Sequence, residues 1–340
     1  MTFIKEYFMS KKSFFRQRVG NMEQLAGLRE VVVNSGRGRD VRLVEVDNGS
    51  GLTFTVMADR CCDIYSAKYM NKSLAWLTPN GIINPNAYEP EGAMWLRSWA
   101  GGLLTTAGLL NVGTPDAGHG LHGRASSLAA EDLKLERLWQ DDEYILSVGG
   151  VMRHTMAFGE KLEVRRTIST AYGKNIIKVS DTVENQGFAP APLMMLYHCN
   201  FGYPTVDENG YLEAVEHKLE PKDEAAAAGI DSWNKLSAPI HDYAEEVFFH
   251  TIPADADGLS RISIVNPDAN LRVTMAYNSA TLPYLNQWKQ MGEGEYVIGL
   301  EPGNCVPIGQ SGNAARGDLK MIEPGETVKF DFQIEISEIK

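Results

Sequence analysis

Two ionisable residues, His198 and Glu301, each stand at the end of a short apolar run. The run before His198 covers residues 192–197, and the run before Glu301 covers residues 296–300. Apolar runs this short predict buried strands, and a strand holds its last residue at a fixed place. An imidazole and a carboxyl group that face one pocket are the two groups that general acid–base catalysis requires. Each also has a simpler interpretation, a histidine bonded to a backbone carbonyl and a glutamate at an exposed strand end. Cys199 is no thiol partner for His198, because adjacent residues of a strand face opposite sides.

Two further histidines lie in a glycine-rich segment. His119 and His122 are three residues apart, and Arg124 follows them. Glycine allows a backbone to approach a ligand closely, so the segment is a candidate binding loop. With His198 and Glu301, the two histidines are also a candidate metal site, and this interpretation stays open.

An aromatic ring stands between an amide and an ammonium group in Gln287-Trp288-Lys289. Aromatic faces beside hydrogen-bonding side chains suit sugars, whose ring faces carry C–H groups and whose rims carry hydroxyls. The alternative is a core tryptophan beside a lysine whose stem packs along apolar surface.

The charge of the chain restricts its partners. Its 340 residues carry a formal net charge of −12, which would repel nucleic acid and anionic membranes. The first twenty residues do not make a signal peptide, and no apolar run reaches the ~20 residues of a membrane span. The four cysteines are too few for a disulfide framework and are interpreted as reduced thiols. We therefore expect a cytoplasmic protein that binds a small ligand, and neither nucleic acid nor membrane.

Strand patterns dominate the rest of the chain. Residues 41–47 and 52–57 alternate around Asn48-Gly49, which predicts a hairpin. Short helices are expected within 10–28 and at 225–228. Further strands are predicted at 144–148, 161–169, 176–183, 193–200, 261–265, 271–277, 296–300 and 328–336. Many antiparallel strands without alternating helices predict an all-β sandwich.

No linker or change of composition marks a domain boundary. We therefore expect one domain over 1–340, in which residues 1–40 are a helical or extended lead-in. Residues 79–125 have little periodicity but contain several tryptophan and tyrosine residues. An irregular stretch of this length is usually functional or disordered, and its aromatic content favours a structured, functional loop region.

Taken together, these residues resemble the aldose 1-epimerase (galactose mutarotase-like) superfamily, and more closely its uncharacterised aldose 1-epimerase family branch. The resemblance extends from about residue 20 to the C-terminus. The motifs that carry it are Asp59-Arg60, Gly101-Gly102-Leu103-Leu104-Thr105-Thr106, Leu121-His122-Gly123-Arg124, Tyr197-His198-Cys199-Asn200-Phe201-Gly202-Tyr203-Pro204, Trp288-Lys289 and Gly299-Leu300-Glu301-Pro302-Gly303-Asn304. It implies a β-supersandwich of mostly antiparallel strands with a few short helices, and a sugar site on a concave sheet.

The resemblance also implies a reaction. Glu301 takes the proton of the anomeric hydroxyl while His198 protonates the ring oxygen, and reclosure of the opened sugar gives the other anomer. Neither a metal nor an organic cofactor is needed for these proton transfers. The substrate-binding residues that it implies are His122, Arg124, Arg60, Arg97, Asn200, Gln287, Trp288 and Lys289, with Glu246 as a candidate carboxylate for sugar hydroxyls.

Two other functions are weighed beside this one. The first is a non-catalytic carbohydrate-binding or sensing protein on the same scaffold. The second is a metal-dependent sugar isomerase or lyase that uses His119, His122, His198 and Glu301. The expected partner in the leading interpretation is a small-molecule carbohydrate, either neutral or anionic, and the chain is considered as a homodimer.

Overall fold

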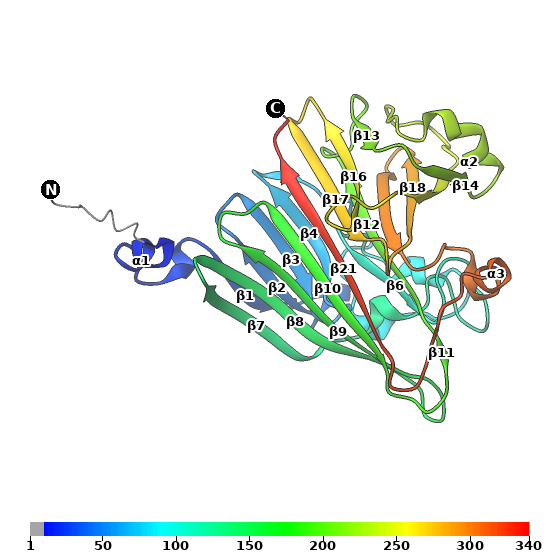
Figure 1. Ribbon diagram of the computed structural model, residues 1–340, viewed down its shortest axis with the longest axis horizontal. Coiled ribbons are helices and arrows are strands. Elements are labelled where there is room, and N and C mark those ends of the chain that lie inside the picture. The colour runs from blue at the N-terminus through cyan, green and yellow to red at the C-terminus, as the bar shows by residue number, and fades with distance from the viewer. Residues whose placement is uncertain (1–9, 340) are drawn as a thin grey trace.

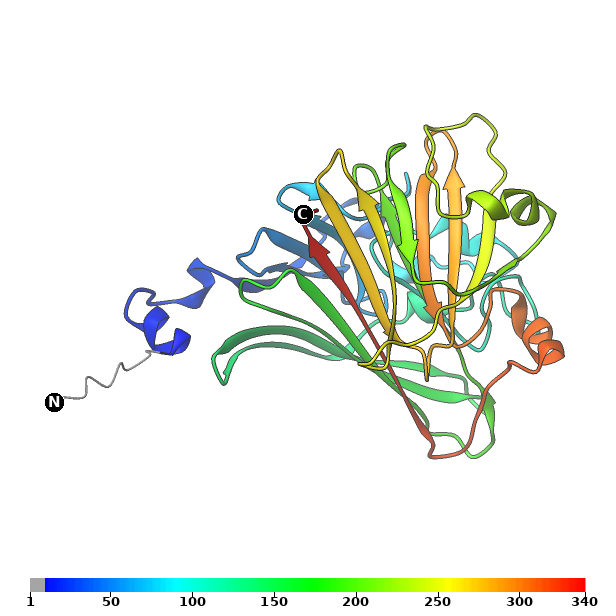
Figure 2. The ribbon, with the colours of Figure 1, turned by 45° about the horizontal axis from the view of Figure 1, so that its top comes forward.

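Antiparallel strands build most of the protein. The computed structural model describes residues 10–339, and the strands of its sheets pair antiparallel throughout those residues. The three α-helices of this part of the chain are short: α1 (Lys11–Arg16), α2 (Glu224–Gly229) and α3 (Gly309–Arg316). The predicted all-β class is confirmed. Helices α1 and α3 lie at opposite ends of the molecule (Figure 2).

An eight-stranded sheet forms one layer of the molecule (Figure 1). In spatial order its strands are β13 (Tyr211–Ala214), β16 (Leu259–Asn266), β17 (Leu271–Asn278), β21 (Thr327–Ser337), β10 (Ile176–Asn185), β9 (Lys161–Ala171), β8 (Glu143–Thr155) and β7 (Glu131–Gln140).

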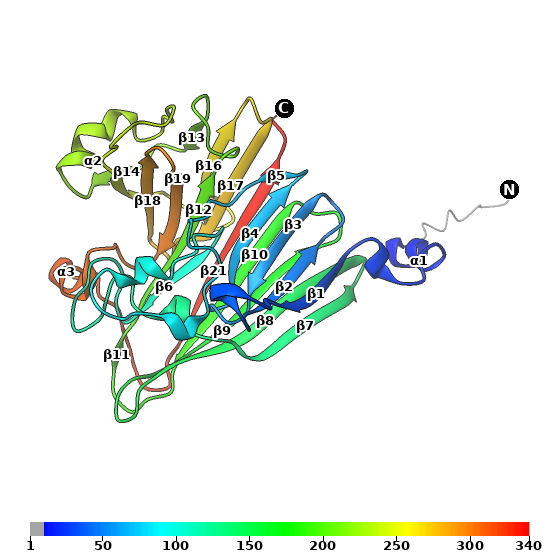
Figure 3. The same ribbon diagram turned by 180° about the vertical axis from the view of Figure 1, so that it is seen from behind.

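Two smaller sheets form the second layer, which faces the viewer in Figure 3. The five-stranded sheet runs β1 (Gly27–Val32), β2 (Arg42–Asp47), β3 (Leu52–Met57), β4 (Asp63–Tyr69) and β5 (Lys72–Ser73). The six-stranded sheet runs β14 (Lys218–Pro221), β15 (Glu246–Thr251), β18 (Tyr284–Met291), β19 (Tyr296–Gly303), β12 (Met194–Gly202) and β6 (Thr105–Leu109). A short ladder joins β11 (Ala191–Pro192) to β20 (Met321–Ile322).

A buried arginine ties the two layers together inside the apolar core. Arg166 of β9 donates to Asp63 of β4 at 2.8 Å and to Asp181 of β10 at 2.6 Å. The hydroxyl of Tyr197 on β12 donates to Asp181 at 2.8 Å. Because Tyr197 points between the layers, the next residue, His198, points to the outer face of the six-stranded sheet.

Most of the predicted elements are present. The hairpin forms from β2 and β3, in which Asp47 pairs with Thr53. A helix covers the expected residues 225–228, and every predicted strand overlaps a strand of the structure. Several strands were not predicted, among them β6, β7, β14, β15 and β18. Strand β6 lies in the irregular region, and β18 carries the polar and aromatic residues of 284–291.

Candidate active site

His198 and Glu301 face each other on neighbouring strands. The register of β12 against β19 pairs Cys199 with Leu300, so His198 lies opposite Glu301 and both side chains share the outer face. The Nδ1 atom of His198 is 3.2 Å from the Oε1 atom of Glu301, and both side chains are buried. Within the described part of the chain neither atom has a partner in hydrogen-bonding geometry. The two groups touch but are not locked together, so a ligand hydroxyl can bond to either of them.

A pocket of about 210 Å³ opens over this pair. Ligand pockets for drug-sized molecules typically hold about 300–1,000 Å³, so this pocket is suited to a ligand the size of one monosaccharide. The residues that line it are Trp95, Leu96, Trp99, Gly113, Thr114, Leu121, His122, His198, Lys222, Glu245, Val247, Trp288, Glu301 and Pro307. The sheet therefore supplies the floor, and the loops that follow β5 and β6 supply the walls.

Indole rings surround the histidine. The ring of Trp99 lies 5.1 Å from that of His198, and the ring of Trp288 lies 5.5 Å from it on another side. The indole N–H of Trp99 donates to the Thr105 hydroxyl at 3.1 Å, which fixes the orientation of this ring. Trp95 packs on Trp99 at 4.8 Å. Aromatic faces held in this way suit the C–H faces of a sugar.

His122 is held in one tautomer. Its Nδ1 atom accepts a hydrogen bond from the backbone N–H of Gly113 at 3.3 Å, so its proton resides on Nε2. Burial, aided by the positive charge of Lys222, lowers the pKa of His122 to about 4. The ring lies 5.5 Å from the ring of His198. At neutral pH, His122 is therefore an uncharged hydrogen-bond donor beside His198 and Glu301.

Burial in the pocket also shifts the pKa values of Glu301 and His198. Loss of water raises the pKa of Glu301 well above its usual range, and the nearby Glu245 carboxylate raises it further. Burial lowers the pKa of His198 well below its usual range, and His122 adds to this effect. A neutral carboxyl and a neutral imidazole are favoured in the empty pocket. This neutral pair holds the same number of protons as a carboxylate beside an imidazolium, so the two states interconvert by moving one proton.

Three predicted arginine anchors lie away from the pocket. Arg60 is buried, and its guanidinium donates to two backbone carbonyl groups. Arg97 is exposed and contacts the sulfur of Met94. Arg124 lines a separate depression with His119. The structure does not place these three arginines in the pocket with His198 and Glu301. They belong to turns or to a short 3-10 helix, where no periodicity shows which way a side chain points.

Gln287 and Lys289 also lie away from the pocket. They flank Trp288 on β18, and alternate residues of a strand face opposite sides. The amide of Gln287 donates to the Trp233 carbonyl at 2.8 Å, and the Lys289 ammonium lies 3.2 Å from Glu246. The predicted sugar platform is therefore reduced to Trp288 alone, and Glu246 is not the carboxylate of the pocket.

Asn200 and His119 take other places in the fold. The Asn200 amide donates to the carbonyl groups of Gly102 and His198, and so supports the strands behind the pocket. His119 does not line the pocket that holds His122 and His198. No three acidic, histidine or cysteine side chains within residues 10–339 converge on a point that could hold a metal ion. The four residues of the metal-dependent alternative are therefore not brought together.

Two charged residues of the pocket were missed from the sequence. Glu245 accepts a hydrogen bond from the indole N–H of Trp288 at 2.8 Å. Lys222 follows the edge strand β14 and lines the same pocket. The available signal was the spacing of Glu245 and Val247, which are two residues apart and therefore share one face if the segment is extended.

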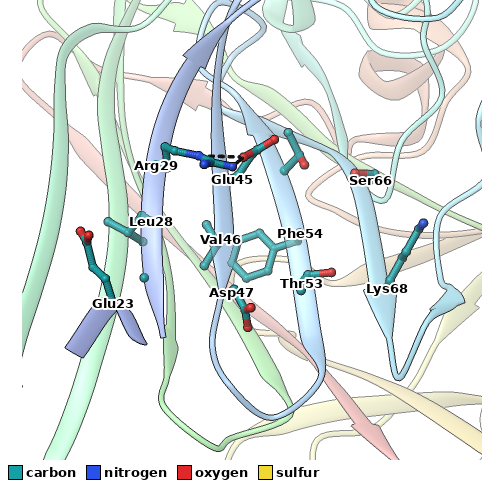
Figure 4. Close-up of a pocket in the computed structure, with 12 residues that line it drawn as sticks. Glu23, Leu28, Arg29, Glu45, Val46, Asp47, Thr53, Phe54, Ser66 and Lys68 are labelled. Atoms are coloured by element: carbon teal, nitrogen blue, oxygen red, sulfur yellow. Dashed lines mark hydrogen bonds and ion pairs between the residues drawn. The ribbon is translucent and has the colours of Figure 1, made fainter. Parts of the chain in front are cut away.

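A larger depression of about 500 Å³ lies on the outer face of β1 to β4 (Figure 4). Its polar residues include Arg29, which pairs with Glu45 at 2.6 Å across two strands. The carboxyl and amine groups there face solvent, and no histidine lies among them. We therefore choose the candidate site by the close contact of His198 with Glu301 and not by the size of the cavity.

The arrangement of strands is shared with solved structures of aldose 1-epimerase-like and galactose mutarotase-like proteins. A candidate aldose 1-epimerase from Klebsiella pneumoniae superposes with a TM-score of 0.86 at 21% identity, over 93% of this chain and 86% of that one. A galactose mutarotase-like protein from Clostridium acetobutylicum gives 0.64 at 13% identity, over 93% of this chain and all of the other (100%). The galactose 1-epimerase of Lactobacillus acidophilus gives 0.61 at 12% identity, over 93% and 100%. At these identities the likeness shows the fold, which is the galactose mutarotase-like β-sandwich expected from the sequence.

The family can be stated more closely. Residues 38–336 match the family described as "Domain of unknown function (DUF4432)", and the chain belongs to it. No curated protein matches the chain. Within residues 10–339 no helix is long and apolar enough to cross a membrane.

Proposed function

We propose that the protein interconverts the anomers of a monosaccharide or a close derivative, as an aldose 1-epimerase does. One observation carries the proposal: the 3.2 Å contact between His198 and Glu301 at the floor of a sugar-sized pocket. The pocket offers an acid, a base, a fixed N–H donor on His122 and aromatic walls. Ring opening and reclosure of a sugar need these groups and no others.

In the proposed reaction Glu301 takes the proton of the anomeric hydroxyl and His198 gives a proton to the ring oxygen. The C–O bond of the ring breaks, and an open-chain aldehyde forms. Rotation about the C1–C2 bond and reclosure with the proton transfers reversed give the other anomer. A hydroxyl that donates to Glu301 favours its carboxylate form, and the proton then passes to His198 without uptake from solvent.

Exchange between anomers tests the proposal directly. Freshly dissolved α-anomers of neutral and acidic sugars would be followed by polarimetry or NMR exchange spectroscopy with the wild type, His198→Asn and Glu301→Gln. We expect each variant to fold and to lose about 10²–10⁴-fold in rate, the usual contribution of a general acid or base. Near wild-type exchange by either folded variant would contradict the mechanism. Sugar binding by the wild type without exchange would favour the non-catalytic carbohydrate-binding alternative.

A further inference from the structure

Lys222 extends the floor of the pocket beyond β14. Its backbone N–H donates to the carbonyl of Val247 at 3.0 Å, which continues the β14–β15 ladder by one residue. The register then runs from Lys222 through Val247 to Trp288 and Gly299. Residues of one such row share a face, so Lys222 lies on the face that carries Glu301. This agrees with its place in the lining of the pocket.

The ammonium group of Lys222 has no protein partner among residues 10–339, neither in a hydrogen bond nor in an ion pair. The contrast with Lys289 is informative, because that lysine is bonded to the Ser232 carbonyl and to Glu246. The carboxylate on the same rim, Glu245, is bonded to the indole of Trp288. Lys222 is exposed at the rim of the pocket, so its ammonium group faces solvent and is free to bond to a ligand.

The position of Lys222 relative to the reacting pair defines which part of a sugar it would meet. Strand β14 lies three strands from β19, a backbone separation of about 14 Å at the usual strand spacing. Glu301 therefore lies toward one end of the pocket and Lys222 toward the other. The positive charge is nevertheless close enough to lower the pKa of both Glu301 and His122. A sugar with its anomeric carbon at Glu301 would direct its far substituent toward Lys222.

We propose that Lys222 selects a sugar that carries an anionic group, a carboxylate, phosphate or sulfonate, on the side away from its anomeric carbon. The proposal rests on the anomeric centre being bound at His198 and Glu301, as in the proposed function. An unpaired ammonium forms its strongest hydrogen bonds with charged oxygens. Burial favours the uncharged forms of Glu301 and His198, which limits the repulsion of such a ligand.

The test compares matched neutral and anionic sugars in equilibrium binding. Glucose and galactose would be titrated beside glucuronate, galacturonate, glucose 6-phosphate and 6-deoxy-6-sulfoglucose, followed by ligand-observed NMR or calorimetry. The proteins are the wild type, Lys222→Gln, Lys222→Arg and Lys218→Gln. Lys218 lies on the same strand, is exposed and is absent from the pocket, so its variant controls for the loss of one positive charge.

We expect the wild type to bind at least one anionic sugar about tenfold more tightly than its neutral parent, the factor that ~1.4 kcal/mol supplies. Lys222→Gln should lose this preference, whereas Lys222→Arg and Lys218→Gln should keep it, and added salt should weaken it. Equal affinity for neutral and anionic sugars, no binding of any anionic probe, or an unchanged preference in Lys222→Gln would each overturn the inference.

Anomer exchange measured on the same samples separates this inference from the proposed function. A charge preference that depends on Lys222, without any exchange, supports the role of Lys222 and refutes the enzyme. Exchange of neutral sugars without a charge preference supports the enzyme and refutes the role of Lys222.

Discussion

The carboxyl group of Glu301 occupies the space that a side chain at Gly299 would need. The two residues are two positions apart on β19 and share its outer face. A Cβ atom on residue 299 would lie 2.5 Å from the Oε1 atom of Glu301 and 3.1 Å from the Cβ atom of Trp288. The absence of a side chain at Gly299 therefore allows the carboxyl group to lie against the strand and to meet His198.

Gly299→Ala is expected to reduce anomer exchange without unfolding the protein. The added methyl group has to displace the Glu301 carboxyl group, and a misplacement of about 1 Å can cost about 10²-fold in rate. Exchange rates and the thermal unfolding midpoint would be measured together. Gly20→Ala is the control, because nothing lies within 4 Å of the Cβ position there. An unaltered rate in Gly299→Ala would show that the position of the carboxyl group is not critical.

Glu245→Gln is expected to shift the pH dependence of kcat/KM. The Glu245 carboxylate raises the pKa of Glu301, so its removal lowers that pKa. If Glu301 acts as the base, its carboxylate then forms at lower pH, and the rising limb of the profile moves toward acid. Glu246→Gln is the control, because that residue pairs with Lys289 on the opposite face. If the acidic limb of the pH profile moved in both variants, or in neither, Glu301 would not be the base whose pKa Glu245 raises.

Truncation of Trp288 should affect KM, whereas truncation of its neighbour Gln287 should affect the stability of the fold. Trp288→Leu removes an aromatic wall of the pocket, and KM should rise by about tenfold, since ring stacking and burial together contribute at least ~1.4 kcal/mol. Gln287→Ala leaves His250 and a carbonyl group without a partner, which should lower the free energy of unfolding by about 1–3 kcal/mol and leave KM unchanged. Steady-state kinetics and urea unfolding measure the two quantities. A rise of KM in Gln287→Ala would mean that both faces of β18 serve the ligand.

The sequence allowed the closeness of His198 and Glu301 to be predicted, and it also named His122 and Trp288, which line the same pocket, but it did not lead to Lys222 or Glu245. His198 and Glu301 each follow an apolar run that predicts a strand, although β12 and β19 continue past them to Gly202 and Gly303, and strand alternation determines which face each side chain takes. Lys222 and Glu245 give no such signal, because only the register of four strands brings them beside Glu301. Adjacent residues of a strand face opposite sides, which places Cys199 away from His198 and likewise Gln287 away from Trp288. This alternation could not be applied to Gln287 and Trp288 from the sequence, because the segment did not look like a strand.

The positions of the arginines could not be predicted for a different reason. Arg60, Arg97 and Arg124 belong to turns or to a short 3-10 helix, where a side chain points according to tertiary contacts. Arg60 shows this clearly, because its guanidinium is directed inward to the carbonyl groups of Ile83 and Ser98. Proximity in sequence to His122 therefore did not predict where the Arg124 side chain lies.

His154 is expected to make the fold sensitive to acid. The side chain is buried, neither ring nitrogen has a hydrogen-bond partner among the described residues, and burial lowers its pKa from 6.5 to about 4. A pKa that is lower in the folded state gives stability that is present above pH 6.5 and is lost as the pH falls toward 4, because the unfolded chain takes up the proton first. The loss is about 3 kcal/mol. In urea unfolding at pH 7 and pH 4, His154→Leu should therefore lose about 3 kcal/mol less than the wild type. The control is His241→Leu, at an exposed histidine. An equal acid-induced loss in His154→Leu and wild type would show that His154 does not remain neutral in the folded protein.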